Sequence, residues 1–254
     1  MTTVTTLSAD RIAEGLREET GAFAGIVAGA DPAGRVPTCP EWTVKDLVEH
    51  VGNAFRWTAG LVESRAATPE SLAPLTEEVA PADWAAWLKE GAERLADAGL
   101  REAGTEVWTF LGPRPAVFWP RRILHDLVVH HADAALALGV PYTVAPDIAA
   151  DTISEGLELL EGPEAAARKP ELGELRGDGE RLLLRPDAGD GWLITRTPRG
   201  VAWTRGDGEA DVVLEGTVAE LLLVFSRRRP LDGSPARVTG DRALLEHWLA
   251  HTAF

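Results

Sequence analysis

The run from Arg121 to Asp133 constrains the fold most, because it sets polar side chains into an otherwise apolar helix. The apolar residues of the run are Ile123, Leu124, Leu127, Val128 and Val129. At about 100° per residue, Asp126 and His130 lie about 40° apart on one helical face, and Asp133 lies within about 20° of Asp126. A buried carboxylate and a buried imidazole both need partners. The run therefore predicts a bundle helix whose polar face meets a partner.

A metal ion is one such partner, and a further histidine extends the candidate ligand set. His50 lies beside the apolar stripe of another expected helix. If the two helices pack together, His50, Asp126 and His130 form a three-ligand site for zinc or another divalent metal, with the open position of a catalytic centre. The alternative is a simple hydrogen bond between Asp126 and His130, which are one helical turn apart.

Composition limits the partners of the chain. It has 254 residues and a net charge of −15, which disfavours binding to nucleic acid or to an anionic membrane. No segment approaches the ~20 apolar residues of a membrane span, and residues 1–7 do not resemble a signal peptide. The single cysteine, Cys39, excludes an intrachain disulfide. We expect a cytoplasmic protein that is a monomer or a homodimer, without nucleic-acid or membrane partners.

Apolar periodicity predicts helices through the first part of the chain. Ser8 or Asp10 caps the first helix, and Thr43, with Asp46 three residues on, caps the second. The first helix is expected to end near Gly29. The later helices are expected to span about 44–65, 82–98, 120–138 and 146–160. The prolines at positions 37 and 40 favour an extended arm before the second helix.

The pattern changes after Gly162. Short strands separated by Gly, Asp and Pro turns are expected at 182–185, 191–196, 201–205 and 210–216. Two helices capped by Thr217 and Asp241 are expected after them. The predicted fold class is therefore α followed by α+β, with a helical bundle at 1–160 and a smaller α+β domain at 161–254.

The remaining candidate side chains have simpler interpretations. His125 and His131 point about 120° away from the Asp126/His130 face, so we expect them to pack against or cap neighbouring elements. His247 and His251, one turn apart, have no evident third ligand, which favours a solvated face. Cys39 precedes a proline and lies at no helix N-terminus, which favours a structural thiol. Residues 227–229 are arginines that either complement a helix dipole or bind an anion.

Two motifs resemble the mycothiol-dependent maleylpyruvate isomerase family of actinobacteria. The first, Val36-Pro-Thr-Cys-Pro-Glu-Trp-Thr-Val-Lys-Asp-Leu-Val-Glu-His50, leads in that family into a DinB-like up-down four-helix bundle, and its last histidine is a zinc ligand. The second, His125 to Asp133, resembles the family pattern H-E-x-x-x-H-x-x-D. It implies Asp126 and His130 as metal ligands and Asp133 as a hydrogen-bonding residue. Asp126 departs from the usual glutamate and is one methylene shorter.

The resemblance also implies a function. The C-terminal part is similar to sterol carrier proteins and implies a basic residue near the metal, for which Arg227 is the candidate and Arg228 the alternative. The family uses mycothiol, a low-molecular-weight thiol. The expected activity is isomerisation or S-transfer on a small electrophile such as maleylpyruvate, with catalytic roles for Asp133 and Arg227. The alternatives are a protein of this fold that binds a metal or small ligand without catalysis, and a structural or regulatory partner that has lost catalysis.

Overall fold

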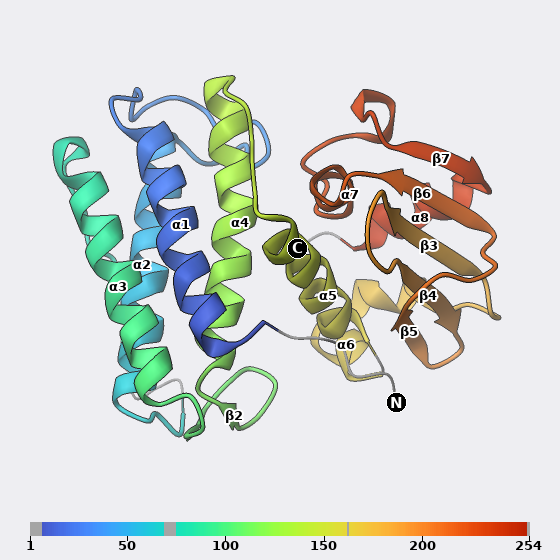
Figure 1. Cartoon of the computed structure of the whole chain (residues 1–254), viewed down its shortest axis with the longest axis horizontal. Coiled ribbons are helices and arrows are strands. Elements are labelled where there is room, and N and C mark those ends of the chain that lie inside the picture. The colour runs from blue at the N-terminus through green and yellow to red at the C-terminus, as the bar shows by residue number, and fades with distance from the viewer. Residues whose placement is uncertain (1–6, 69–74, 162, 253–254) are drawn as a thin grey trace. The chain divides into compact units, whose positions relative to one another are not determined.

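The computed structural model describes residues 7–68, 75–161 and 163–252 (Figure 1). It divides into two compact units, one formed by Leu7–Val144 and the other by the chain from Ala145 onward. The first unit is helical and the second contains a sheet, so the predicted fold class is confirmed. In the described part of the chain, no helix is long and apolar enough to cross a membrane.

The first unit is a bundle of four helices: α1 (Ala9–Val27), α2 (Val44–Glu63), α3 (Trp84–Arg101) and α4 (Phe118–Leu138). Helix α1 packs against α3 and α4, and α2 packs against the same two helices. Ser8 caps α1 by accepting a hydrogen bond from the backbone NH of Arg11. Thr43 and Asp46 form a reciprocal capping box at the start of α2, as their spacing predicts.

Buried aliphatic and aromatic side chains hold the bundle together. Leu47, Val48 and Phe55 of α2 are fully buried, as are Leu88 and Leu95 of α3. A two-stranded ribbon, β1 (Glu106–Val107) and β2 (Arg114–Pro115), precedes α4. Helix α4 ends at Gly139, whose φ of 65° is the left-handed conformation that glycine adopts without strain.

The second unit is built on a five-stranded sheet of order β5-β4-β3-β6-β7. Its strands are β3 (Arg181–Pro186), β4 (Trp192–Thr197), β5 (Gly200–Arg205), β6 (Val212–Gly216) and β7 (Arg237–Gly240). Strands β3 and β6 are parallel and the other neighbours are antiparallel. The helices of this unit are α5 (Pro146–Leu160), the short α6 (Pro163–Arg168), α7 (Val218–Phe225) and α8 (Arg242–His251). Thr217 and Asp241 cap α7 and α8 as expected.

Helix α5 belongs to the second unit, whereas the sequence placed it in a bundle domain spanning 1–160. Ser154 of α5 accepts a hydrogen bond of 2.9 Å from the indole of Trp192 on β4. At Gly156 the helix approaches α7 so closely that a Cβ would lie 2.6 Å from Cε1 of Phe225. The chain therefore divides after Val144, and not after residue 160, because the buried face of α5 packs on the sheet unit.

Candidate metal centre

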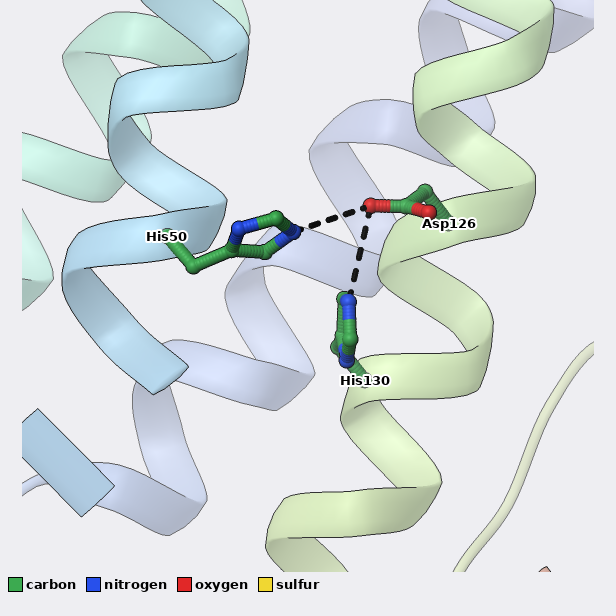
Figure 2. A group of neighbouring side chains, drawn as sticks. All are labelled: His50, Asp126 and His130. Atoms are coloured by element: carbon green, nitrogen blue, oxygen red, sulfur yellow. Dashed lines mark ion pairs between the residues drawn. The ribbon is translucent and has the colours of Figure 1, made fainter. Parts of the chain in front are cut away.

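The structure brings together the three side chains that the sequence offers as metal ligands. His50 comes from α2, and Asp126 and His130 come from α4 (Figure 2). Nε2 of His50 and Nε2 of His130 each lie 3.6 Å from Oδ2 of Asp126. One ligand atom from each residue lies within 4.8 Å of the other two. The packing of α2 on α4 thus closes a site that neither helix forms alone.

The three side chains differ in their access to solvent. His50 lies at the edge of the buried stripe of α2, and 41% of its side chain is exposed. His130 is 10% exposed, and Asp126, at 30%, lies between these values. The site is therefore anchored in the bundle on the α4 side and open to solvent on the His50 side.

The carboxylate of Asp126 is held in its ionised form. Burial raises the pKa of this group, but contacts with His50, His130 and Arg122 lower it more, so the pKa lies well below its ordinary value. Arg122, one turn earlier on α4, donates a hydrogen bond of 3.0 Å to Oδ1. Oδ2 therefore faces the two imidazoles while Oδ1 is bonded to the guanidinium.

Asp133 orients His130 from behind. It is fully buried, and its Oδ2 lies 2.9 Å from Nδ1 of His130. Because an ionised carboxylate only accepts, Nδ1 donates the hydrogen, and Nε2 keeps a lone pair on the side of Asp126. Thr38 donates a hydrogen bond of 2.5 Å to Oδ1, and Sγ of Cys39 lies 3.9 Å from Oδ2. This histidine–carboxylate pair is an arrangement that fixes a metal-binding imidazole.

The segment before α2 supplies these contacts, and it folds back on itself instead of extending as expected. Its ends pair through a bridge between Arg35 and Thr43. The backbone NH of Val36 bonds the carbonyl of Trp42, and that of Trp42 bonds the carbonyl of Cys39. These turns set the Trp42 ring with its centroid 4.8 Å from that of His50 and 5.6 Å from that of His130.

The residues present fit a zinc ion. Tetrahedral zinc ligands lie about 2.0–2.2 Å from the ion, which sets two ligand atoms about 3.3–3.6 Å apart. The two nitrogen–oxygen distances to Asp126 are 3.6 Å. Two imidazole nitrogens and one carboxylate oxygen are also a donor set of catalytic zinc sites. The shorter aspartate side chain therefore still reaches both histidines.

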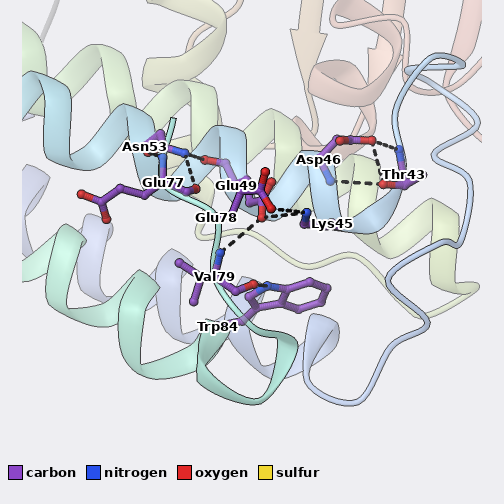
Figure 3. Close-up of polar contacts among 9 residues, drawn as sticks. All are labelled: Thr43, Lys45, Asp46, Glu49, Asn53, Glu77, Glu78, Val79 and Trp84. Atoms are coloured by element: carbon purple, nitrogen blue, oxygen red, sulfur yellow. Dashed lines mark hydrogen bonds and ion pairs between the residues drawn. The ribbon is translucent and has the colours of Figure 1, made fainter. Parts of the chain in front are cut away.

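An open groove of about 780 Å³ begins at the exposed side of the site, where Trp42 and His50 line it. It continues along α2 past Asn53 and Trp57, with residues 75–78 as its opposite wall. Asn53 fastens this wall to α2 through two hydrogen bonds with the backbone of Glu77, of 3.0 and 3.1 Å (Figure 3). A small molecule thus has a path to the side of His50.

The other histidines are engaged elsewhere. Nδ1 of His131 lies 2.9 Å from a carboxylate oxygen of Glu19 on α1, in the buried core, as its direction on α4 predicts. His125 is buried in the bundle as well. In the second unit, Nε2 of His247 lies 2.9 Å from the carbonyl of Glu174, and Nδ1 of His251 lies 2.8 Å from that of His247. None of these four joins the candidate metal set of the described residues.

Arg227 follows α7 in the second unit and is exposed. Sequence reasoning did not single out Arg122, Thr38 or Trp42, although the last two lie inside the first motif. Arg122 precedes Asp126 by four residues, a spacing that signals an ion pair on a helix. Thr38 and Trp42 reach the site through the folded-back turns, for which the sequence carries no periodic signal.

The chain combines a four-helix bundle with an α+β unit that follows it. The bundle brings two imidazoles and one carboxylate together across α2 and α4. These features define a class of two-unit proteins with a candidate metal centre. The family model of the mycothiol maleylpyruvate isomerase N-terminal domain matches residues 14–135. The chain belongs to this family, which confirms the resemblance carried by the two motifs.

The chain is also similar to two relatives and to solved structures. The chain is 30% identical to uncharacterized proteins of two Mycobacterium tuberculosis strains over 157 residues, which is 56% of this chain and 75% of theirs. The crystal structure of the mycothiol-dependent maleylpyruvate isomerase superposes with a TM-score of 0.59, at 19% identity, over 92% of this chain and 95% of that chain. A mutant of the same enzyme gives a TM-score of 0.60. The likeness in structure shows a common fold across both units.

Proposed function

We propose that this protein is a metal-dependent enzyme that uses mycothiol to isomerise, or to transfer sulfur to, a small electrophile similar to maleylpyruvate. The observation that carries the proposal is the His50–Asp126–His130 cluster, open to solvent at His50 and backed by Asp133. Family membership supports mycothiol as the thiol. We propose zinc as the metal and the cytoplasm as the site of action, with the chain working as a monomer or homodimer.

His50, Asp126 and His130 would hold the metal. When bound, a divalent metal supplies a lowered pKa for a thiol, so that the nucleophilic thiolate forms at neutral pH. Asp133 keeps the Nε2 lone pair of His130 directed at the site. We infer that it acts as a positioning residue, because its buried oxygens already bond Thr38 and His130.

The thiolate would then react with the electrophile. In the isomerisation, a sulfur–carbon bond forms at one end of the cis double bond and the electron pair moves onto the conjugated carbonyl oxygen. Rotation about the resulting single bond and cleavage of the sulfur–carbon bond return the electron pair and give the trans product. When the electrophile carries a leaving group, the same attack ends in S-transfer. Arg227, or Arg228 as the alternative, would bind a carboxylate of the substrate.

Turnover with a defined thiol tests the proposal. Maleylpyruvate is incubated with mycothiol and the zinc-supplemented protein, and the loss of maleylpyruvate absorbance is followed. The rate for the wild type is compared with the rates for His50→Ala and His130→Ala. We expect turnover that needs both mycothiol and the intact cluster. Activity that survives both substitutions would refute this site.

A second function is favoured by one observation, the short Asp126 side chain bonded to Arg122. In this hypothesis the protein binds a metal or a small ligand without catalysis. Zinc binding in the absence of any thiol-dependent turnover, with a small molecule that co-purifies with the protein, would support it over the enzyme.

A further inference from the structure

Arg122 is bonded to the candidate metal ligand Asp126 from one turn earlier on α4. Its guanidinium donates a hydrogen bond of 3.0 Å to Oδ1. The other oxygen, Oδ2, is the one that lies 3.6 Å from Nε2 of His50 and 3.6 Å from Nε2 of His130. Figure 2 shows both of these ion pairs meeting at one carboxylate oxygen. The two oxygens of Asp126 therefore have different partners, a cation on one and the two histidines on the other.

Helix stability gives little reason for this ion pair. In a pair four residues apart on a helix, the more favourable order places the acidic residue before the basic one. Here the order is reversed, because Arg122 precedes Asp126. Both side chains are also largely buried, at 21% and 30% exposed, so the guanidinium gives up hydration to make the contact. The contact therefore points to a role at the carboxylate itself.

Metal affinity gives no reason for the arginine either, because a positive charge beside a cation site repels the cation. What the arginine changes is the number of oxygens that Asp126 can offer. A carboxylate binds a metal through one oxygen or through both. The hydrogen bond from Arg122 to Oδ1 is charge-assisted, which is the stronger class, and it competes with a metal for that oxygen. Asp126 is thereby restricted to coordination through Oδ2.

The number of oxygens decides whether a further ligand can reach the metal. Two imidazole nitrogens and one carboxylate oxygen fill three positions of a tetrahedral site, and the fourth stays open. A carboxylate that bound through both oxygens would fill this fourth position as well. A nearby guanidinium also favours an anion there, since a positive charge lowers the pKa of a thiol and stabilises the thiolate.

We propose that Arg122 is a positioning residue that holds Asp126 to coordination through one oxygen and so keeps one position of the metal centre open for a thiol. The inference deepens the proposed function, on which it rests for the metal and the thiol. It concerns the coordination of the centre and the access of any small thiol to it, whereas the proposed function concerns turnover with mycothiol.

Cobalt(II) in place of zinc makes the coordination visible, because four-coordinate cobalt absorbs visible light more strongly than five-coordinate cobalt. The cobalt-loaded full-length protein is compared with Arg122→Met, which removes the donor and its charge, and with Arg122→Lys, which keeps a charged donor at the same spacing. We expect the strong absorption in the wild type and in Arg122→Lys, and a weaker absorption in Arg122→Met. The sulfur-to-cobalt charge-transfer band of added 2-mercaptoethanol should show about tenfold weaker thiol binding in Arg122→Met. Arg114→Gln, which removes an exposed charge from β2, should match the wild type.

The cobalt content of each variant separates coordination from folding, and we expect about one cobalt per chain in all of them. Equal spectra and equal thiol affinity in the wild type and Arg122→Met would overturn the inference, as would an equal loss in Arg122→Lys or Arg114→Gln. An Arg122→Met protein that binds no cobalt would also overturn it, because Arg122 would then build the site instead of limiting its coordination. The proposed function fails separately, when the expected spectra and thiol affinities are found but mycothiol supports no turnover.

Discussion

Asp133 is the residue on which the orientation of His130 depends. We expect Asp133→Asn to weaken zinc binding about 10- to 100-fold, because an amide holds the imidazole less firmly and lowers its basicity. Competition against a chromophoric chelator measures the dissociation constant. An unchanged constant in a folded variant would show that His130 is oriented by something other than Asp133.

Thr38 acts on the same carboxylate from the folded-back turns. Thr38→Val keeps the shape but removes the hydroxyl that donates to Oδ1 of Asp133. We expect a smaller loss of zinc affinity in the same direction, of about tenfold. Thr38→Ser is the matched control and should keep the affinity of the wild type. An equal loss in Thr38→Ser and Thr38→Val would assign the effect to packing and not to the hydrogen bond.

At this scale the sequence predicts which side chains share a face, but not which loops reach them. Helical angles place Asp126, His130 and Asp133 together because all of them lie on α4. The contact of these residues with His50 depends on how α2 packs on α4. The amphipathic stripe of α2 indicates the face through which it packs. The contacts of Thr38 and Trp42 depend on turns closed by backbone bonds, and no spacing rule foresees them.

At the scale of elements, Gly52 sets the distance between α2 and α3. A Cβ at this position would lie 1.9 Å from a ring atom of Trp87. Gly52→Ala is expected to lower the free energy of unfolding by about 1–3 kcal/mol through overpacking. Gly25→Ala in α1, where a Cβ meets no atom within 4 Å, should instead raise it by up to about 1 kcal/mol. Denaturant unfolding measures the free energy of unfolding of both variants. Equal changes in Gly52→Ala and Gly25→Ala would refute the close contact at Gly52.

An ion pair between α2 and α3 gives the bundle a pH dependence. Hydrogen bonds from Arg94 lower the pKa of Glu63. Because the pKa is lower in the folded protein, the contact stabilises above the unfolded pKa of Glu63 and is lost as the pH falls through the folded value. Glu63→Gln should therefore lower the melting temperature at pH 7, by an amount equivalent to at most about 1 kcal/mol. The difference should shrink towards pH 3, and a constant difference would contradict the assignment.

Elements were predictable where apolar periodicity is long and a cap marks the start, as for α2 with Thr43 and α7 with Thr217. Strand β7 was missed because it is a short edge strand with three of its residues exposed, so it has no apolar pattern. The partner of α5 was also missed. Its periodicity identifies a buried face, but nothing in the sequence says which unit covers that face.

For the whole molecule, the division after Val144 makes a direct prediction about fragments. Residues 1–144 should fold as a helical bundle that binds zinc, because the ligands and their supporting residues all precede that point. A fragment of residues 1–160 adds α5 without the sheet that covers its apolar face, so we expect it to aggregate more readily. Size-exclusion chromatography of both fragments measures this. If the fragment of residues 1–160 aggregates less than the fragment of residues 1–144, α5 belongs with the bundle.

The central claim is that His50, Asp126 and His130 form one metal centre. Its most direct test is the zinc content of the untagged full-length protein, measured by elemental analysis beside His130→Ala and the buried-histidine control His131→Gln. We expect about one zinc per chain in the wild type and in His131→Gln, and none in His130→Ala. Absence of zinc from the wild type after incubation with the metal, or its retention in His130→Ala, would contradict it.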